Sequence, residues 1–434
     1  MRNNSAYAFV LAFASVQALF VACTSSGSKV GAGGADSGAE KPDSGGPDAG
    51  AQAAGCTDAT PFVGGAVVAN RTLTKACSPY AISSAINVDG NATLTIEAGV
   101  TLNFAQNLAV NVGAQSAAKL VANGTAASPI KFTSANSTPG AGDWEGIKFW
   151  GGVMNGSSIS YSTLDYCGQS ASACIHGQGG VKTGRVTVDH ATISHIGNGA
   201  NGIQEDDVAS NFTISNCTFN NVPNTQTQRY AISVLAPSFA GIDSTNTFNA
   251  GAMIELAGDA VSATTDWRNP GAPVAVTSKV SLDGATAPVL TIAAGTTFKF
   301  ARGTSFEVGY SSGGNLKANG TATAPVTFTS LNSLPTAGDW NGIMLWSGGQ
   351  ATLQFANVLY GGGNTGSASL SGDISVAGSN ARLTLLNSTI SNSATYGLYI
   401  PCGSTSTVTI TSDTFSGNLN SDVGPGPTGS SVCP

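Results

Sequence analysis

All three histidines of the chain lie between positions 176 and 195, and acidic side chains surround them in the sequence. His176, His190 and His195 are accompanied by Asp189 and by the acidic run at 205–207, and Arg185 precedes them. Imidazole and carboxyl groups are common partners in general acid–base catalysis, and grouped carboxylates also bind cations. If these segments stack on one face, the candidate catalytic residues are four: His176, His190, Glu205 and Asp206.

A structural role competes with catalysis at two of these histidines. In a repeated pattern described below, His190 and His195 each align with two asparagines: His190 with Asn216 and Asn387, and His195 with Asn221 and Asn392. Asparagine favours turns because its side chain hydrogen-bonds to nearby backbone. We therefore favour a turn role for this segment over catalysis. The chain has no serine-nucleophile elbow, no phosphate loop and no zinc-like Cys/His spacing, so we expect neither a metal nor a cofactor.

Tryptophan offers a second kind of chemistry, the stacking of an aromatic ring against the apolar face of a sugar. Trp144 and Trp340 each follow Gly-Asp, and Trp150 and Trp346 recur at matched positions six residues later. Trp144 and Trp340 are the candidate glycan-binding residues. The alternative, which we favour, is that Gly-Asp-Trp closes a turn and the indole lies over the adjacent coil.

The elements that position these residues are repetitive. The block Leu94–Trp150 returns 196 positions later, without a gap, as Leu290–Trp346, and more than half of its positions are identical. A repeat at fixed offset indicates stacked structural units rather than a single globule. Apolar residues alternate at period two in short runs such as Leu94/Ile96 and Leu102/Phe104, and each run ends at Gly, Asn, Asp or Pro, which is typical of short strands.

A shorter period sets the size of the unit. An aliphatic residue, three further residues, Thr and another apolar residue recur, so that neighbouring copies end at 164, 193 and 219 and later at 390 and 415. Spacings of 25 to 29 residues accommodate three short strands and three turns. Stacked coils of that length bury a continuous inward row of like residues.

This pattern resembles the right-handed parallel β-helix of many bacterial surface proteins. The segments that carry the resemblance are Leu290–Gly295, Gly320–Pro325 and Gly338-Asp-Trp340. The resemblance implies an all-β solenoid with two related halves, 56–265 and 266–434, and the alternatives are a β-sandwich or a propeller. It implies no activity, because this fold carries lyases, hydrolases, adhesins and scaffolds. Pectin-acting members pair Asp residues with His-Gly and Arg-x-Lys signatures, which His176-Gly177 and Asp206-Asp207 do not reproduce in order.

The first residues indicate export. Arg2 precedes an apolar run at 6–22, and the small residues before Cys23 resemble the lipobox of bacterial lipoproteins, in which the cysteine is lipidated. We expect residues 1–22 to be a signal peptide, and residues 23–55, rich in Gly, Ala, Ser, Asp and Pro, to be a disordered tether behind a lipidated Cys23. Thr24, rather than Asp, after the cysteine resembles lipoproteins that are sorted to an outer membrane. The alternative is an ordinary secretory signal cut near Ala22.

Seven further cysteines suit an oxidising compartment. We expect three local disulfides, which join Cys56 to Cys77, Cys167 to Cys174, and Cys402 to Cys433. The remaining thiol, Cys217, aligns with Ala191, Ser388 and Asp413 between apolar positions, so we expect it to be packed rather than reactive.

Charge narrows the function further. Only 9% of residues are charged and the net charge is −7, which argues against a nucleic-acid partner. We expect a protein anchored to the outer membrane or cell surface by lipid alone. Its expected role is non-catalytic glycan contact, adhesion or envelope structure, with a polysaccharide or another surface protein as partner. The alternative is a polysaccharide lyase or glycoside hydrolase that uses the central histidines and acids.

Overall fold

The computed structural model describes residues 56, 60–169, 173–178, 185–207, 211–220, 230–363 and 371–425. Compactness divides the chain into two units, Met1–Asp48 and Ala49–Pro434, and every described residue belongs to the second. The expected signal peptide, Cys23, the tether up to residue 55 and Cys433 lie outside the described residues. Among the described residues, no helix has the length and apolar character needed to cross a bilayer.

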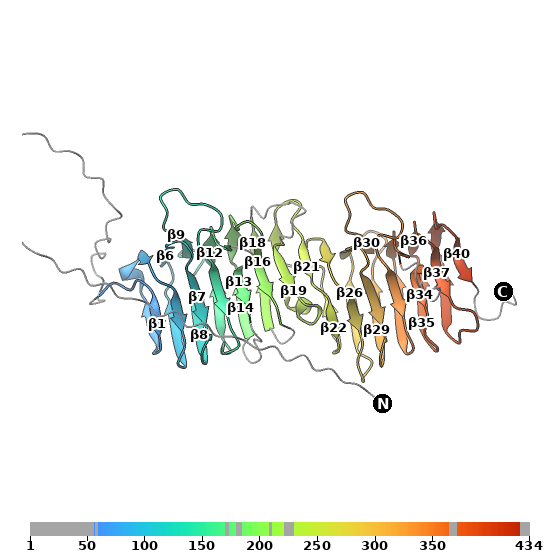
Figure 1. The fold of residues 1–434 in the computed structure, drawn as a ribbon, viewed down its shortest axis with the longest axis horizontal. Helices are drawn as coiled ribbons and strands as arrows, with labels where there is room; N and C mark the ends of the chain where they lie inside the picture. The colour runs from blue at the N-terminus through green and yellow to red at the C-terminus, as the bar shows by residue number, and fades with distance from the viewer. Residues whose placement is uncertain are drawn as a thin grey trace, which may run out of the picture. The chain divides into compact units, whose positions relative to one another are not determined.

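Short strands make up the unit Ala49–Pro434, and every strand pairing within its five sheets is parallel (Figure 1). The chain visits three sheets in turn and then returns to the first, one strand further along the stack. This order is that of a parallel β-helix, so the all-β solenoid expected from the sequence is confirmed.

One sheet, here called the long sheet, runs through the whole stack, and two pairs of shorter sheets complete its coils. The long sheet contains β1 (Gly65–Val67), β4 (Ile86–Val88), β7 (Ala109–Val112), β10 (Gly146–Phe149), β13 (Ala173–Gly177), β16 (Asn201–Glu205), β19 (Ile232–Val234), β21 (Ile254–Leu256), β24 (Val274–Val276), β27 (Thr297–Phe300), β30 (Val326–Ser330), β33 (Ala356–Leu359), β36 (Thr389–Ser391) and β39 (Thr414–Ser416).

The first half of the stack adds two sheets. The β2–β17 sheet contains β2 (Arg71–Leu73), β5 (Ala92–Ile96), β8 (Ala118–Asn123), β11 (Ser157–Ser160), β14 (Arg185–Asp189) and β17 (Asn211–Ser215). The β3–β20 sheet contains β3 (Tyr80–Ile82), β6 (Thr101–Phe104), β9 (Ile130–Ser134), β12 (Ser162–Asp165), β15 (Thr192–Ser194), β18 (Thr218–Phe219) and β20 (Thr247–Phe248).

The second half adds two others. The β22–β40 sheet contains β22 (Asp259–Val261), β25 (Val280–Leu282), β28 (Ser305–Val308), β31 (Gly342–Leu345), β34 (Gly372–Val376), β37 (Tyr396–Ile400) and β40 (Ser421–Pro425). The β23–β38 sheet contains β23 (Thr265–Trp267), β26 (Val289–Ala293), β29 (Gly314–Asn319), β32 (Gly349–Gln354), β35 (Arg382–Leu386) and β38 (Thr407–Thr411). Two short 3₁₀ helices, η1 (Lys75–Cys77) and η2 (Ala236–Gly241), accompany the strands.

An unbroken apolar row explains why these short strands stack. Side chains alternate between the two faces of a strand, so every second residue points into the coil. Paired residues of the long sheet then form one inward row: Ile86, Val110, Ile147, Ile175, Ile203, Ile232, Ile254, Val274, Phe298, Phe328, Val358 and Ile390. All of these side chains are buried, and burial of each contributes roughly 1.5–3 kcal/mol.

The two halves of the repeat are displaced by one sheet. Ile147 lies on β10 in the long sheet, whereas its repeat equivalent Ile343 lies on β31 in the β22–β40 sheet. Conversely, Phe132 lies on β9 of the β3–β20 sheet, whereas its equivalent Phe328 lies on β30 of the long sheet. Equivalent strands therefore occupy different faces of the solenoid in the two halves, which the offset in the sequence does not reveal.

Two of the three expected disulfides are seen, Cys56–Cys77 and Cys167–Cys174. Cys402 is also disulfide-bonded. Cys217 is free and buried, so the expectation of a packed residue is confirmed, and burial raises the pKa of its thiol to about 12.

Candidate functional site

The closest meeting of the predicted catalytic groups is between His176 on β13 and Asp206, which follows β16. His176 Nε2 lies 2.7 Å from Asp206 Oδ2, because β13 and β16 are neighbours in the long sheet and His176 pairs with Gln204. Gln204 Nε2 donates to the other oxygen, Asp206 Oδ1, at 2.7 Å. Strand pairing across one coil therefore brings together residues that are 30 positions apart.

Both ring nitrogens of His176 are occupied. Nδ1 lies 2.9 Å from the Gln178 amide nitrogen, while Nε2 faces Asp206. Donation from Gln178 to Nδ1 leaves the proton on Nε2, where it is donated to Asp206. Because the His176 side chain is only 5% exposed, no imidazole nitrogen is left to exchange a proton with a substrate in this arrangement.

Asp206 is the open member of the pair, with 46% of its side chain exposed. Partial burial by itself raises its pKa, but hydrogen bonds from His176 and Gln204 leave the pKa below its ordinary value. Asp206 is therefore an ionised hydrogen-bond acceptor at neutral pH, which suits binding of hydroxyl groups better than it suits proton donation.

Glu205 does not join this pair. It is next to Asp206 in the sequence, but strand alternation points its side chain into the coil, where it is 2% exposed. Its Oε1 accepts from the Phe212 backbone N–H at 2.9 Å. Burial raises the pKa of Glu205 to about 7, although hydrogen bonds from Ser238 and Phe212 oppose the shift. The prediction that Glu205 shares a face with His176 and Asp206 is wrong because the two faces of one strand diverge.

His190 lies elsewhere as well, so the condition under which it was a catalytic candidate, a face shared with His176, is not met. It occupies the turn after β14 with a positive φ of 50°, and Asn216 and Asn387 have φ values of 53° and 51°. Its Nδ1 lies 2.6 Å from Asp189, and its ring stacks on Tyr161 with centroids 4.3 Å apart. The turn interpretation of the sequence is therefore confirmed, since left-handed backbone tolerates His and Asn.

His195 repeats that arrangement one turn later. Its φ is 48° and that of its expected equivalent Asn392 is 61°, while Asn221 lies outside the described residues. The ring of His195 stacks on Tyr166, and its Nδ1 lies 2.6 Å from Asp165 Oδ1. Both histidines therefore extend columns of turn residues, and the cluster seen in the sequence separates into one pair and two turns.

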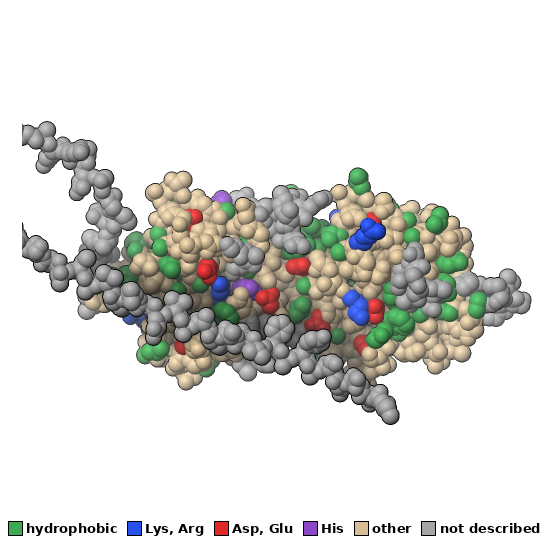
Figure 2. Space-filling view, viewed as in Figure 1, with side chains coloured by type: hydrophobic (Ala, Val, Ile, Leu, Met, Phe, Trp, Pro, Cys, Tyr) green, Lys and Arg blue, Asp and Glu red, His purple; other side chains and the backbone are tan. Residues whose placement is uncertain are grey.

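The His176–Asp206 pair belongs to a longer polar row. Residues on the outer face of the long sheet that pair with one another in register are Asn87, Asn111, Lys148, His176, Gln204, Ser233 and Glu255. Adjacent members interact, as when Asn111 donates to Asn87 at 2.9 Å and Ser233 donates to Glu255 at 2.6 Å. Figure 2 shows basic, acidic and histidine side chains gathered over these middle strands. We call this set the polar row.

Trp144 and Trp340 do not contribute to an exposed surface. Each indole is fully buried and stacks on a phenylalanine, Trp144 on Phe104 at 4.3 Å and Trp340 on Phe300 at 4.1 Å. Each ring N–H donates to a main-chain carbonyl of the next coil, at 2.8 Å in both halves. Their assignment as glycan-stacking residues is therefore wrong, because both faces of each ring are covered. Both tryptophans instead match the structural alternative, in which the indole lies over the adjacent coil.

The aspartates of the two Gly-Asp-Trp motifs explain why the motif recurs. Asp143 accepts from Ser134, Asn136 and the Gly140 N–H, and Asp339 accepts from Ser330 and Thr336 in the same way. Burial tends to raise the pKa of Asp143, but these hydrogen bonds lower it overall, as at Asp339. The motif therefore ties a surface loop to the coil while the tryptophan fills the core.

Trp150 was not predicted from the sequence as a binding residue, yet it lies at the candidate site. It is partly exposed, and its indole N–H donates to Asn111 Oδ1 at 3.2 Å, so the ring lies beside the polar row. Its repeat equivalent Trp346 packs edge-on against the exposed Tyr310 near a different sheet. The signal in the sequence was available, because Trp150 follows the inward Phe149 directly and alternation places consecutive residues on opposite faces.

Metal ligands are not grouped in the described part of the chain, where no three His, Cys, Asp or Glu side chains converge as an ion would require. The arrangement on the long sheet therefore consists of hydrogen-bond donors and acceptors, one exposed carboxylate and one partly exposed indole. Chemically, these groups are suited to contact with a polyhydroxylated surface.

Comparison with known families gives one match. A model described as a pectate-lyase-like β-helix domain matches residues 65–174 and 274–380, which together make up half of the chain. The two matched segments fall one in each half of the solenoid. No curated protein and no solved structure matches the chain.

Proposed function

The chain belongs to the pectate-lyase-like β-helix domain family, and we propose that its long sheet is a non-catalytic contact surface for an extended polysaccharide. Membership of this family supports a solenoid architecture and leaves the activity open, because function depends on the site rather than on the fold. The proposal therefore depends on the residues of the polar row.

The observation that carries this proposal is the polar row itself, with Trp150 beside it. Strands in a sheet lie about 4.8 Å apart, so the partly exposed side chains of Asn111, Lys148 and Gln204 present polar groups at multiples of that interval. A regular polymer with hydroxyl groups along its length matches such spacing better than a compact ligand does. The Trp150 ring adds an apolar surface next to Asn111, where a sugar ring would stack.

Support for binding rather than turnover comes from the His176–Asp206 pair. A general base needs a nitrogen or oxygen within reach of the substrate proton and a pKa near the working pH. Both His176 nitrogens are engaged within the protein, and the pKa of Asp206 is lowered rather than raised. These groups therefore favour a fixed hydrogen-bonding surface.

We also propose that the protein is attached to a membrane surface, and this part of the proposal rests on the sequence. Lipid on Cys23 would anchor the protein to a membrane surface, and the residues that follow would separate the folded unit from it. A Cys23→Ala variant is expected to move from the detergent-extracted membrane fraction to the soluble fraction. Retention of that variant in the membrane fraction would contradict a lipid anchor at this position.

The glycan-binding proposal is tested with the full chain and immobilised neutral and acidic polysaccharides. We expect Trp150→Ala and Asn111→Ala to reduce retention, since they remove the stacking ring and the amide that holds it. Trp346→Ala is the matched control, because it removes the equivalent ring near another sheet. Equal retention of all three variants and the original protein would overturn the proposal.

A lyase or hydrolase is the second candidate function, and the observation that favours it is the exposed Asp206 carboxylate beside His176. Incubation with the same polysaccharides, followed by assays for new reducing ends and for unsaturated products, separates the two functions. Turnover that disappears in Asp206→Asn would establish the enzyme. Retention without turnover is the result expected from the contact surface.

A further inference from the structure

A cavity lies where the two halves of the solenoid meet. The β2–β17 sheet ends at β17 and the β22–β40 sheet begins at β22, and the short helix η2 packs between these two strands in place of a strand. A helical turn does not continue the flat surface of a sheet. The result is a hollow of about 270 Å³, here called the junction pocket.

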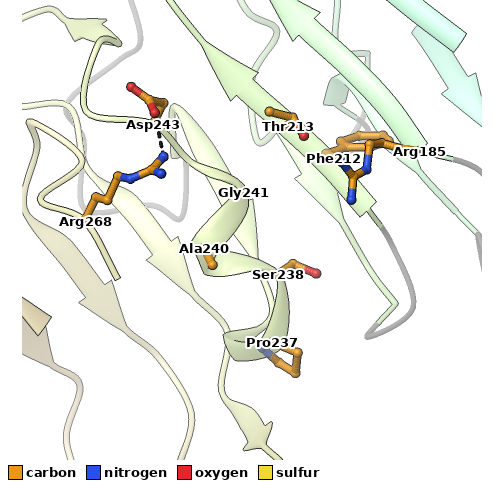
Figure 3. A pocket seen from close by; sticks show the side chains of 9 residues that line it. All are labelled: Arg185, Phe212, Thr213, Pro237, Ser238, Ala240, Gly241, Asp243 and Arg268. Atoms are coloured by element: carbon orange, nitrogen blue, oxygen red, sulfur yellow. Dashed lines mark hydrogen bonds and ion pairs between the residues drawn. The ribbon is translucent and has the colours of Figure 1, made fainter. Parts of the chain in front are cut away.

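Two arginines from different coils line this hollow. Arg185 begins β14 and Arg268 follows β23, and Figure 3 shows them on opposite sides of the cavity, with η2 along its lower edge. Phe212 provides an apolar wall near Arg185, and Ser238 of η2 also lines the hollow, although its hydroxyl group hydrogen-bonds to Glu205. In a chain with a net charge of −7, two guanidinium groups that line one hollow form a local concentration of positive charge.

The two guanidinium groups differ in how they are held. Arg268 Nη1 donates to Asp243 Oδ2 at 2.7 Å, which fixes the group and leaves its other N–H donors available. Among the described residues, the Arg185 side chain has no hydrogen-bond or ion-pair partner, although its backbone N–H donates to Asn155. The pocket therefore contains more donors than acceptors and keeps a net positive charge after the Asp243 pair is counted.

We propose that the junction pocket binds a phosphate group. A guanidinium donates two parallel hydrogen bonds to two oxygens, so two guanidinium groups from opposite walls need an anion with at least three accessible oxygens. A carboxylate has two oxygens in one plane, so it cannot offer a separate pair of oxygens to each of the two guanidinium groups. A tetrahedral phosphate has four oxygens, enough for a separate pair to face each of Arg185 and Arg268. The cavity volume suits a group of this size, or a phosphate ester on one sugar.

This site is distinct from the polar row and does not depend on it. The junction pocket opens on the face of the solenoid that carries η2, whereas the polar row lies on the long sheet. Failure of polysaccharide binding would leave the phosphate proposal standing, and the reverse also holds.

The repeat supplies a matched control for the test. Arg382 begins β35 as Arg185 begins β14, it is also exposed, and among the described residues it has no side-chain partner, but it does not line the junction pocket. Its removal changes the net charge as the removal of Arg185 does. An effect of general electrostatic attraction would therefore appear equally in Arg185→Ala and Arg382→Ala.

The experiment titrates the full chain with inorganic phosphate, glucose 6-phosphate, glucuronate and glucose, followed by calorimetry and by the phosphorus NMR signal. We expect both phosphate compounds to bind, Arg185→Ala and Arg268→Ala each to weaken binding about tenfold or more, and Arg382→Ala to leave it unchanged. Tighter binding of glucose 6-phosphate would identify a phosphorylated sugar as the source, and equal binding would identify free phosphate.

Three results would overturn the proposal. Glucuronate that binds as tightly as phosphate would identify a carboxylate site, and unchanged binding in both arginine variants would place phosphate elsewhere. Equal weakening in Arg382→Ala would reduce the effect to net charge. Arg185→Lys adds a geometric check, because a lysine keeps the charge but not the paired donors, and we expect it to recover binding only in part.

Discussion

The two halves of the solenoid are packed in the same way in their interiors. In both halves a Gly-Asp-Trp motif ties a loop with its aspartate and stacks its tryptophan on a phenylalanine, and the indole N–H donates to the next coil at the same distance, 2.8 Å. The residues after the accepting carbonyls, Tyr166 and Tyr360, have φ values of 59° and 63°. Contacts inside the coil therefore explain why these residues are the same in the two halves.

The halves differ in how they fasten the loop next to that tryptophan. The first half uses the Cys167–Cys174 disulfide. At the matching positions of the second half, the Gly361 N–H donates to the buried carboxyl of Asp373 at 2.7 Å. Burial raises the pKa of Asp373 well above its ordinary value, against hydrogen bonds from Gly361 and Ser393. A disulfide in the first half and a buried hydrogen bond in the second thus close the same loop. The two halves share the geometry of this loop but differ in the type of bond that closes it.

Outward residues differ more. His176 and Gln204 of the first half correspond to Ser375 and Tyr399 of the second, where the equivalent row lies on the β22–β40 sheet and is buried at both positions. The polar row with its exposed Asp206 therefore belongs to the first half alone. The contact surface that we propose therefore lies in the first half, and the second half continues the solenoid without an equivalent exposed row at these positions.

The largest expected effect tests the shared interior. We expect Trp144→Ala and Trp340→Ala each to lower the free energy of unfolding by about 3–5 kcal/mol, because each leaves a cavity and an unpaired carbonyl. Denaturant unfolding of the two variants measures this. A Trp144→Ala protein of unchanged stability that fails to bind polysaccharide would restore the binding role and break the symmetry.

The next effect concerns Glu205, whose inward position is taken by Ile400 in the second half. Its pKa rises from 4.5 to about 7 on folding, so the folded protein binds the proton more tightly than the unfolded chain does. The stability from this group is complete below pH 4.5 and is lost as the pH rises through about 7, a loss of about 3 kcal/mol.

Glu205→Gln is expected to remove this pH dependence, since the amide has nearly the same shape and no proton to lose. Unfolding curves at pH 4.5 and pH 8 measure it, and the pH 4.5 pair serves as the control because both folded proteins are then neutral at this site. A parallel fall in the stability of both proteins between these pH values would assign the dependence to other groups.

The loop fastenings give the third prediction. Replacing both Cys167 and Cys174 with Ala is expected to lower the free energy of unfolding by about 2–3 kcal/mol, the amount for a short closed loop. Asp373→Ala is expected to cost about 1–3 kcal/mol, because the buried Gly361 N–H loses its acceptor. Unfolding with and without reductant separates the two, since only the first half should respond to reductant at this loop.

The smallest effect is expected at Cys217. Its thiol lies near the carbonyls of Val188 and Ser215, and the Ser388 hydroxyl of the second half donates to the carbonyls of Leu353 and Leu386 from the corresponding place in its coil. Cys217→Ser should therefore change stability by less than about 1 kcal/mol. Native protein should resist alkylation, and rapid labelling of this thiol would show that it is accessible.

Local pattern was enough to predict much of this fold. Period-two alternation, turn residues and the spacing of 25 to 29 residues predicted strands and coils, and the alignment of His190 with Asn216 and Asn387 predicted their shared turn conformation. Pairing of neighbouring cysteines was predicted at Cys56–Cys77 and Cys167–Cys174. These features depend on residues close in the chain or on one repeating unit.

The candidate site was predicted less well, because it depends on which face a residue occupies after stacking. Glu205 and Asp206 are neighbours in the chain, yet one lies in the core and the other on the surface. The choice of Trp144 over Trp150 failed for the same reason, since a motif that recurs in both halves marks the interior they share rather than a surface for a ligand.

By itself the sequence determined the coil, because its period and alternation decide which side chains are buried together at every step. Tertiary structure alone decided the displacement of the two halves by one sheet, the pairing of His176 with Asp206 and the junction pocket that Arg185 and Arg268 line. The displacement and the pocket depend on how many residues the chain spends in passing from one half to the other, whereas the His176–Asp206 contact depends on the pairing of β13 with β16. This number of residues decides which sheet each repeated strand joins, and the residues of the repeat do not determine it.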